Sequence, residues 1–64
     1  MPKYYFEEKT EWIGRYVTKT KVFSFIDGVY TLIKEEQVDG FYCSDEMVEY
    51  IASIDATPVE AYVD

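Results

Sequence analysis

The sequence predicts a small α+β domain, in which a small antiparallel β-sheet of three to four strands has one amphipathic helix packed across it. Three observations predict this class. Aromatic and β-branched runs dominate the first 34 residues, an Asp-Gly pair interrupts the last of these runs, and apolar residues recur at helical spacing after Ser44. A mostly β, barrel-like domain with one helix is the alternative.

Length and composition indicate one ordered domain. Sixty-four residues lie near the lower limit for an unaided hydrophobic core, so residues 1–64 are expected to form a single domain. The seven Tyr, four Phe and one Trp favour a packed fold over disorder. A lone cysteine, Cys43, and the lack of an apolar signal segment predict a cytoplasmic (intracellular) protein. No run approaches the ~20 apolar residues of a membrane-spanning helix.

The first third of the chain predicts two strands. Aromatic residues alternate within Lys3–Glu8, which indicates a strand, and the polar residues Lys9–Glu11 suit a turn. Apolar and charged residues interleave in Trp12–Lys21, as expected for a strand with one face in water. Gly14 is expected to mark a bulge or close packing near the start of this strand.

The strongest local signal is the hairpin predicted over Val22–Lys34. A two-residue Asp27-Gly28 loop favours a type I′ turn, since both residues tolerate positive φ. The register that follows gives the pairs Ile26/Val29, Phe25/Tyr30, Phe23/Leu32 and Lys21/Lys34. One face then carries Phe23, Phe25, Tyr30 and Leu32, and the other carries Val22, Ile26, Val29 and Ile33. Because one helix can cover only one face, the second must meet another element, a partner chain or solvent.

Residues 39–64 predict a turn, a helix and a short strand. Asp39-Gly40 is a second turn signal, and Ser44 is a helix N-cap with carboxylates in the first turn. The helix is predicted over residues 45–54, with its apolar side formed by Met47, Tyr50, Ile51 and Ile54. After Pro58, alternation in Val59–Val63 predicts a short edge strand.

Charge is divided unevenly along the chain. Residues 1–34 carry six basic and four acidic side chains, a net charge of +2, whereas residues 35–64 carry nine carboxylates and no cation, which gives −9 and the total of −7. Such a balance disfavours a nucleic acid or an anionic membrane as the partner, because binding to phosphates depends on Lys and Arg. A basic protein surface is favoured instead.

No motif predicts catalysis or a cofactor. The absence of His removes the commonest general base and transition-metal ligand. Cys43 is interpreted as a small apolar side chain at a strand end rather than a nucleophile. The acids at Asp45, Glu46 and Glu49 do not follow the EF-hand pattern, so no metal is expected. The prediction is therefore a protein that is not an enzyme and has no cofactor.

The acidic half predicts a binding function. On a helix, Asp45 and Glu49 lie ~6 Å apart along the axis. This spacing resembles the separation of phosphates along a nucleic-acid strand, which is ~7 Å in an extended strand and 3.4 Å of axial rise per nucleotide in a duplex, so the carboxylates can occupy a basic groove in place of phosphates. In size and charge the chain resembles the small acidic proteins that phages encode against host enzymes, including DNA mimics and inhibitors of restriction or CRISPR effectors; this resemblance of class rests on no motif. The candidate partner-binding residues are Glu35, Glu36, Asp39, Tyr42, Asp45, Glu46 and Glu49.

A homodimeric structural or regulatory module without nucleic-acid mimicry is the alternative function. The two-faced apolar hairpin motivates it, and the basic cluster of Arg15, Lys19 and Lys21 could meet the acidic helix of a second copy.

Overall fold

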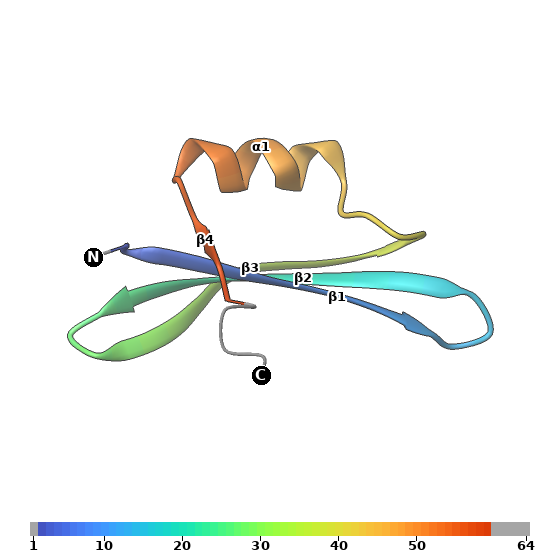
Figure 1. The fold of residues 1–64 in the computed structure, drawn as a ribbon, viewed down its shortest axis with the longest axis horizontal. Coiled ribbons are helices and arrows are strands. Elements are labelled where there is room, and N and C mark those ends of the chain that lie inside the picture. Colours follow the sequence, from blue (N-terminus) through green and yellow to red (C-terminus); the bar gives the residue numbers. More distant parts are fainter. Residues whose placement is uncertain (1, 60–64) are drawn as a thin grey trace.

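The computed structural model of the chain describes residues 2–59, which form one mixed sheet and one helix (Figure 1). The elements are β1 (Tyr4–Trp12), β2 (Tyr16–Ile26), β3 (Val29–Asp39), α1 (Asp45–Ser53) and β4 (Thr57–Pro58). The strand order is β3-β2-β1-β4. The expected α+β class, with a small sheet and one helix, is confirmed. The sheet is not wholly antiparallel, however, because β4 pairs with β1 in parallel.

The turn predicted at Lys9–Glu11 is wrong, since β1 continues through it. Cross-strand contacts hold this segment extended: the hydroxyls of Thr10 and Thr18 lie 2.7 Å apart, and Glu11 Oε2 lies 3.2 Å from Lys19 Nζ. The turn falls instead at residues 13–15, so β2 begins at Tyr16 and not at Trp12. Gly14 supplies a φ of 93° there, and an added Cβ would meet nothing within 4 Å, so its role is conformational rather than close packing.

The hairpin between β2 and β3 is confirmed. Asp27 and Gly28 have φ values of 54° and 78°, and the pairs Ile26/Val29, Phe25/Tyr30 and Phe23/Leu32 form as expected. The predicted pair of Lys21 with Lys34 is wrong. A bulge makes Ile33 an extra residue, because Phe23 pairs with Leu32 whereas Val22 pairs with Lys34, and Lys21 then pairs with Glu35. The bulge thus replaces a like-charge pair with an opposite-charge pair.

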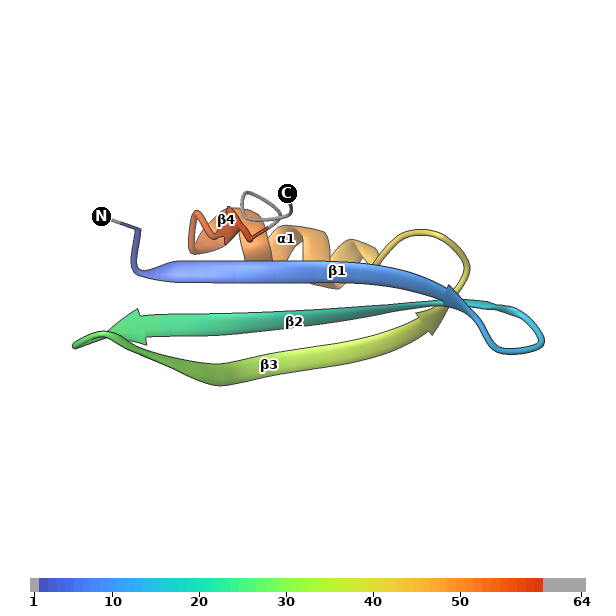
Figure 2. The ribbon, with the colours of Figure 1, turned by 60° about the horizontal axis from the view of Figure 1, so that its bottom comes forward.

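The two sides of the sheet differ in what lies on them. Lys34 and Glu36 of β3 contact residues of α1 and its N-cap, and their cross-strand partners Val22 and Thr20 therefore lie on the same side, termed the helix side. Full burial is found for Val17, Val22, Met47, Thr18 and Thr20. Lys19 and Lys21 lie on the opposite side, termed the open side, where Figures 1 and 2 show no helix over the three long strands.

The helix is much shorter than the strands. Nine residues of α1 span ~14 Å at 1.5 Å per residue, whereas eleven residues of β2 or β3 span ~36 Å at 3.3 Å per residue. The sheet consequently extends beyond both ends of α1 (Figures 1 and 2). Large apolar side chains are exposed at both of these ends. One group, the hairpin end, consists of Ile26, Val29, Tyr30, Leu32 and Ile33; the other, the aromatic tip, consists of Trp12, Ile13, Tyr16 and Phe41.

The helix begins where the sequence predicts. Ser44 is the N-cap, and its Oγ accepts a hydrogen bond from the Met47 N–H at 3.1 Å. The structure has a short strand, β4, at Thr57–Pro58, just before the strand expected at Val59–Val63, and the Val59 N–H donates to the Phe6 carbonyl at 3.0 Å. Residues 60–63 of the expected strand lie outside the described residues.

Candidate functional site

Three carboxylates of α1, at Asp45, Glu46 and Glu49, are all exposed and form what is termed the acidic stripe. Asp45 and Glu49 are four residues apart and thus on one face of the helix. Two ion pairs occur within residues 2–59, and neither includes a residue of the stripe. The negative charge of the stripe is therefore directed to solvent and is not neutralised by the described part of the chain.

Glu36 has an internal role in the structure. Its carboxylate accepts hydrogen bonds from the Ser44 N–H at 2.8 Å and from the Ser44 hydroxyl at 2.7 Å. The same hydroxyl oxygen caps the Met47 N–H, so a chain of three hydrogen bonds joins β3 to the first turn of α1. This carboxylate positions the helix that carries the acidic stripe, and it lies apart from the exposed acids.

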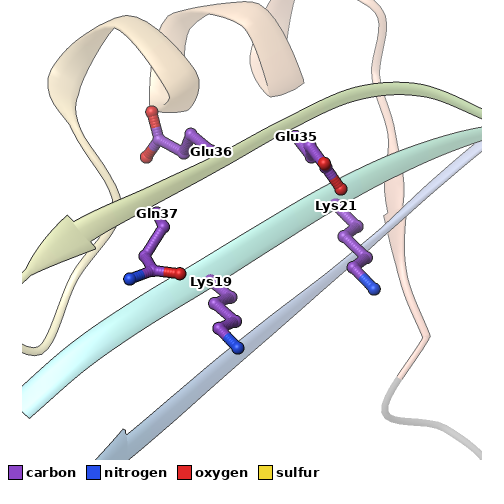
Figure 3. Close-up of a pocket in the computed structure, with 5 residues that line it drawn as sticks. All are labelled: Lys19, Lys21, Glu35, Glu36 and Gln37. Carbon is purple, nitrogen blue, oxygen red and sulfur yellow. The ribbon is translucent and has the colours of Figure 1, made fainter.

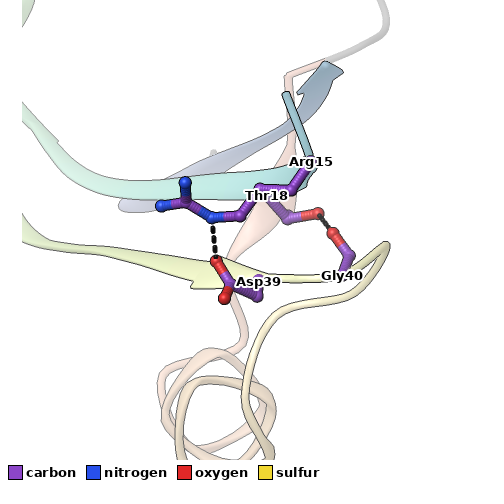
Figure 4. Close-up of polar contacts among 4 residues, drawn as sticks. All are labelled: Arg15, Thr18, Asp39 and Gly40. Atoms are coloured by element: carbon purple, nitrogen blue, oxygen red, sulfur yellow. Dashed lines mark hydrogen bonds and ion pairs between the residues drawn. The ribbon is translucent and has the colours of Figure 1, made fainter. Parts of the chain in front are cut away.

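Asp39 and Glu35 each lie beside a basic residue. Asp39 lies beside Arg15, in the turn before β2, and Glu35 lies beside Lys21 of β2. Asp39 Oδ1 lies 2.9 Å from Arg15 Nε, next to the Thr18 hydroxyl that donates to the Gly40 carbonyl at 2.8 Å (Figure 4). Both partners of the ion pair are more than half exposed, so it contributes at most ~1 kcal/mol. Glu35 pairs across the strands with Lys21 on the open side, where they help to line a hollow of about 450 Å³.

Two of the predicted residues, Glu35 and Glu36, lie on different sides of the sheet. Figure 3 shows Glu36 directed toward α1, whereas Lys19, Lys21 and Gln37 point to the open side. Glu35 and Glu36 are neighbours in β3, but their side chains therefore lie on opposite sides of the sheet. Of the predicted residues, the structure keeps Asp45, Glu46 and Glu49 together on α1 and does not bring Glu35 to them.

Tyr42 precedes α1 and is 81% exposed. The aromatic tip belongs to the same end of the molecule, because the Tyr16 ring lies 4.5 Å from the Phe41 ring and 5.0 Å from the Trp12 ring between centroids. Sequence reasoning did not include Trp12, Tyr16 or Phe41 in the site. The signal that could have found them is their position beside two glycine turns, where a short helix cannot cover them.

Cys43 does not have the surroundings of a nucleophile. Partial burial raises the pKa of its thiol, and the carboxylates of Glu8 and Glu36 raise this pKa further. Glu8 also accepts a hydrogen bond from the Cys43 N–H at 3.1 Å. A thiol with a raised pKa stays protonated at neutral pH, and the thiolate is the reactive form.

Residues 2–59 contain no group of three or more His, Cys, Asp or Glu side chains placed to hold a metal ion. Within the same residues, no helix is long and apolar enough to cross a membrane. Comparison of the chain with protein-family models, with curated proteins and with solved structures found no match.

Proposed function

We propose that this protein is a small acidic binding module, an inhibitor or regulator that docks the acidic stripe on a basic patch of a nucleic-acid-processing protein. The observation that carries the proposal is the exposure of Asp45, Glu46 and Glu49 without an ion-pair partner among residues 2–59. The net charge of −7 adds long-range attraction to a basic surface.

The proposal includes an amphipathic α1 packed across the sheet. Met47 is fully buried, and Tyr50 and Ile51 are half-buried, which supports an inward side for these residues. Lys34 Nζ lies 5.1 Å from the centre of the Tyr50 ring, a cation–π contact that supports a fixed orientation of the helix. With that side inward, Asp45 and Glu49 project outward in one row ~6 Å apart along the axis.

Tyr42 is the aromatic residue of the proposed surface. A ring that is 81% exposed and lies three residues before Asp45 can supply apolar contact area beside the charged row. Phosphate mimicry then has two parts, namely carboxylates in place of phosphates and a ring in place of a base. The partner implied is a protein whose nucleic-acid groove is lined by Lys and Arg.

Charge-driven self-association has less support. Arg15 and Lys19 of the basic cluster are already paired with Asp39 and Glu11 in the same chain. A second copy would have to break these pairs to place the cluster on an acidic stripe.

The test is affinity capture from cell lysate at low and high salt, followed by mass spectrometry and by binding measurements with the purified captured protein. The double variant Glu46→Gln, Glu49→Gln is compared with the double variant Glu7→Gln, Glu35→Gln. The second variant changes the net charge by the same amount, but on β1 and β3 instead of α1. Loss of binding by tenfold or more only in the helix variant is expected, together with weaker binding at high salt. Equal affinity of the two variants would refute the proposal.

A further inference from the structure

The hairpin end is the largest group of exposed apolar residues that the acidic stripe does not explain. Ile26 and Val29 are each 59% exposed, Tyr30 is 50% exposed, and Leu32 and Ile33 are 46% and 42% exposed. The loop of the β2–β3 hairpin, which follows Ile26 and precedes Val29, lies where the sheet extends beyond α1 (Figures 1 and 2). Between Val22 and Ile33 the only charged residue is Asp27, so whatever covers this end must itself be apolar.

The hairpin end also lies at an edge of the sheet. β3 is the last strand in the order β3-β2-β1-β4, so its outer edge is not paired with another strand in the described part of the chain. Proteins protect such edges with bulges and charged residues. Here the bulge at Ile33 and the charges of Lys34, Glu35 and Glu36 protect the second half of β3, whereas Val29–Leu32 has neither device.

We infer that this first half of β3 pairs antiparallel with the same segment of a second copy, around a two-fold axis that is normal to the sheet and passes midway between the two Thr31 residues. In that register Thr31 faces its own copy and Tyr30 faces Leu32, and the bulge at Ile33 ends the regular ladder. Tyr30 and Leu32 both lie on the open side of the sheet, so they can face each other as an antiparallel pair requires. Every cross-strand pair is then apolar or Thr with Thr, which are favourable combinations.

Charge favours the same register. Just beyond the ladder Lys34 comes near Asp27 of the second copy, which is the single acid of the hairpin, while its Nζ lies 5.1 Å from the centre of the Tyr50 ring of its own chain. The symmetry of the pairing creates this contact twice. An unrelated extended peptide would have no reason to carry a carboxylate at that position, so the second copy is the occupant that fits.

The exposed surface of the chain is larger than expected for a monomer, which favours an interface with a second copy. The chain exposes 4797 Å², about 500 Å² more than the ~4,300 Å² of a typical folded monomer of 7.6 kDa. Its radius of gyration is 12.2 Å, against ~10.7 Å for a globular domain of this length. The excess area approaches the ~600 Å² that each partner contributes to a small stable interface.

Analytical ultracentrifugation over a concentration series tests the pairing through the residue on the axis. Thr31→Lys and Thr31→Glu each place like charges opposite one another, and each is expected to weaken dimerisation on the order of tenfold or more. An equal mixture of the two variants places opposite charges there and should restore the dimer. Gln37→Glu, which adds one charge to the protected half of β3, is the control and should dimerise like the wild type.

Three results would overturn the inference. They are a wild-type protein that sediments at 7.6 kDa at every concentration, a dimer that Thr31→Lys does not weaken, and a mixture that stays monomeric. Circular dichroism of each variant separates loss of pairing from loss of fold. The inference does not depend on the acidic stripe, because none of these variants changes α1.

Discussion

Replacement of Thr20 by Val is expected to stabilise the protein. Thr20 is fully buried, and its Oγ1 has no hydrogen-bond partner among the described residues. A buried hydroxyl without a partner costs ~1–3 kcal/mol relative to its hydrated state. Val has nearly the same shape and no polar atom, so Thr20→Val should raise the free energy of unfolding by about 1–2 kcal/mol. For a domain of this size that corresponds to roughly 4–8 °C in Tm per kcal/mol.

Thr18 supplies the matched control. It is also fully buried on β2, two residues away, but its hydroxyl contacts the Thr10 hydroxyl at 2.7 Å and donates to the Gly40 carbonyl at 2.8 Å. Thr18→Val removes both bonds and should lower the free energy of unfolding by about 1–3 kcal/mol. Urea unfolding followed by far-UV circular dichroism measures both variants, with equal slopes required for the comparison. If the two substitutions change stability in the same direction, the reasoning from hydroxyl pairing is refuted.

Two further predictions concern the start of α1. Ser44→Ala removes the cap on the Met47 N–H and should lower the free energy of unfolding, measured in urea, by ~1–2 kcal/mol. Ser53→Ala, at the exposed end of the helix, should lower it by less. Equal losses in the two variants would contradict the capping role of Ser44. Burial and the carboxylate of Glu8 raise the pKa of Cys43, so alkylation of its thiol by iodoacetamide at about pH 8 should be slower in the folded protein than in urea-unfolded protein. Glu8→Gln should accelerate alkylation of the folded protein. An unchanged rate in Glu8→Gln would exclude the carboxylate as a cause of the raised pKa.

The elements set by local chemistry could be predicted from the sequence. Asp27-Gly28 determines the hairpin because few other residue pairs tolerate two positive φ values, and Ser44 determines the helix start because its side chain replaces a backbone acceptor. The exposure of Asp45 and Glu49 follows from helical periodicity alone. These predictions need no knowledge of distant parts of the chain.

The features set by distant contacts could not be predicted. Lys9–Glu11 has the composition of a turn, and its pairing with β2, which includes the contacts of Thr10 with Thr18 and of Glu11 with Lys19, makes it a strand. Nothing near Ile33 marks it as the bulge residue. The same holds for the site: Glu36 appeared equivalent to Glu35 in the sequence, and its role at the helix start depends on a contact with Ser44 that the bulge makes possible.

The bulge also affects how the number of residues in β3 can change during evolution. A relative that lacked Ile33 would keep the pairs from Lys34 to Asp39 unchanged, because the remaining residues would alternate regularly from Leu32 onward. A relative with the same length but no bulge would instead turn Glu36 to the open side and leave the helix start without its acceptor. Homologues are therefore expected to differ at this position by the loss of a whole residue more readily than by a straightened strand.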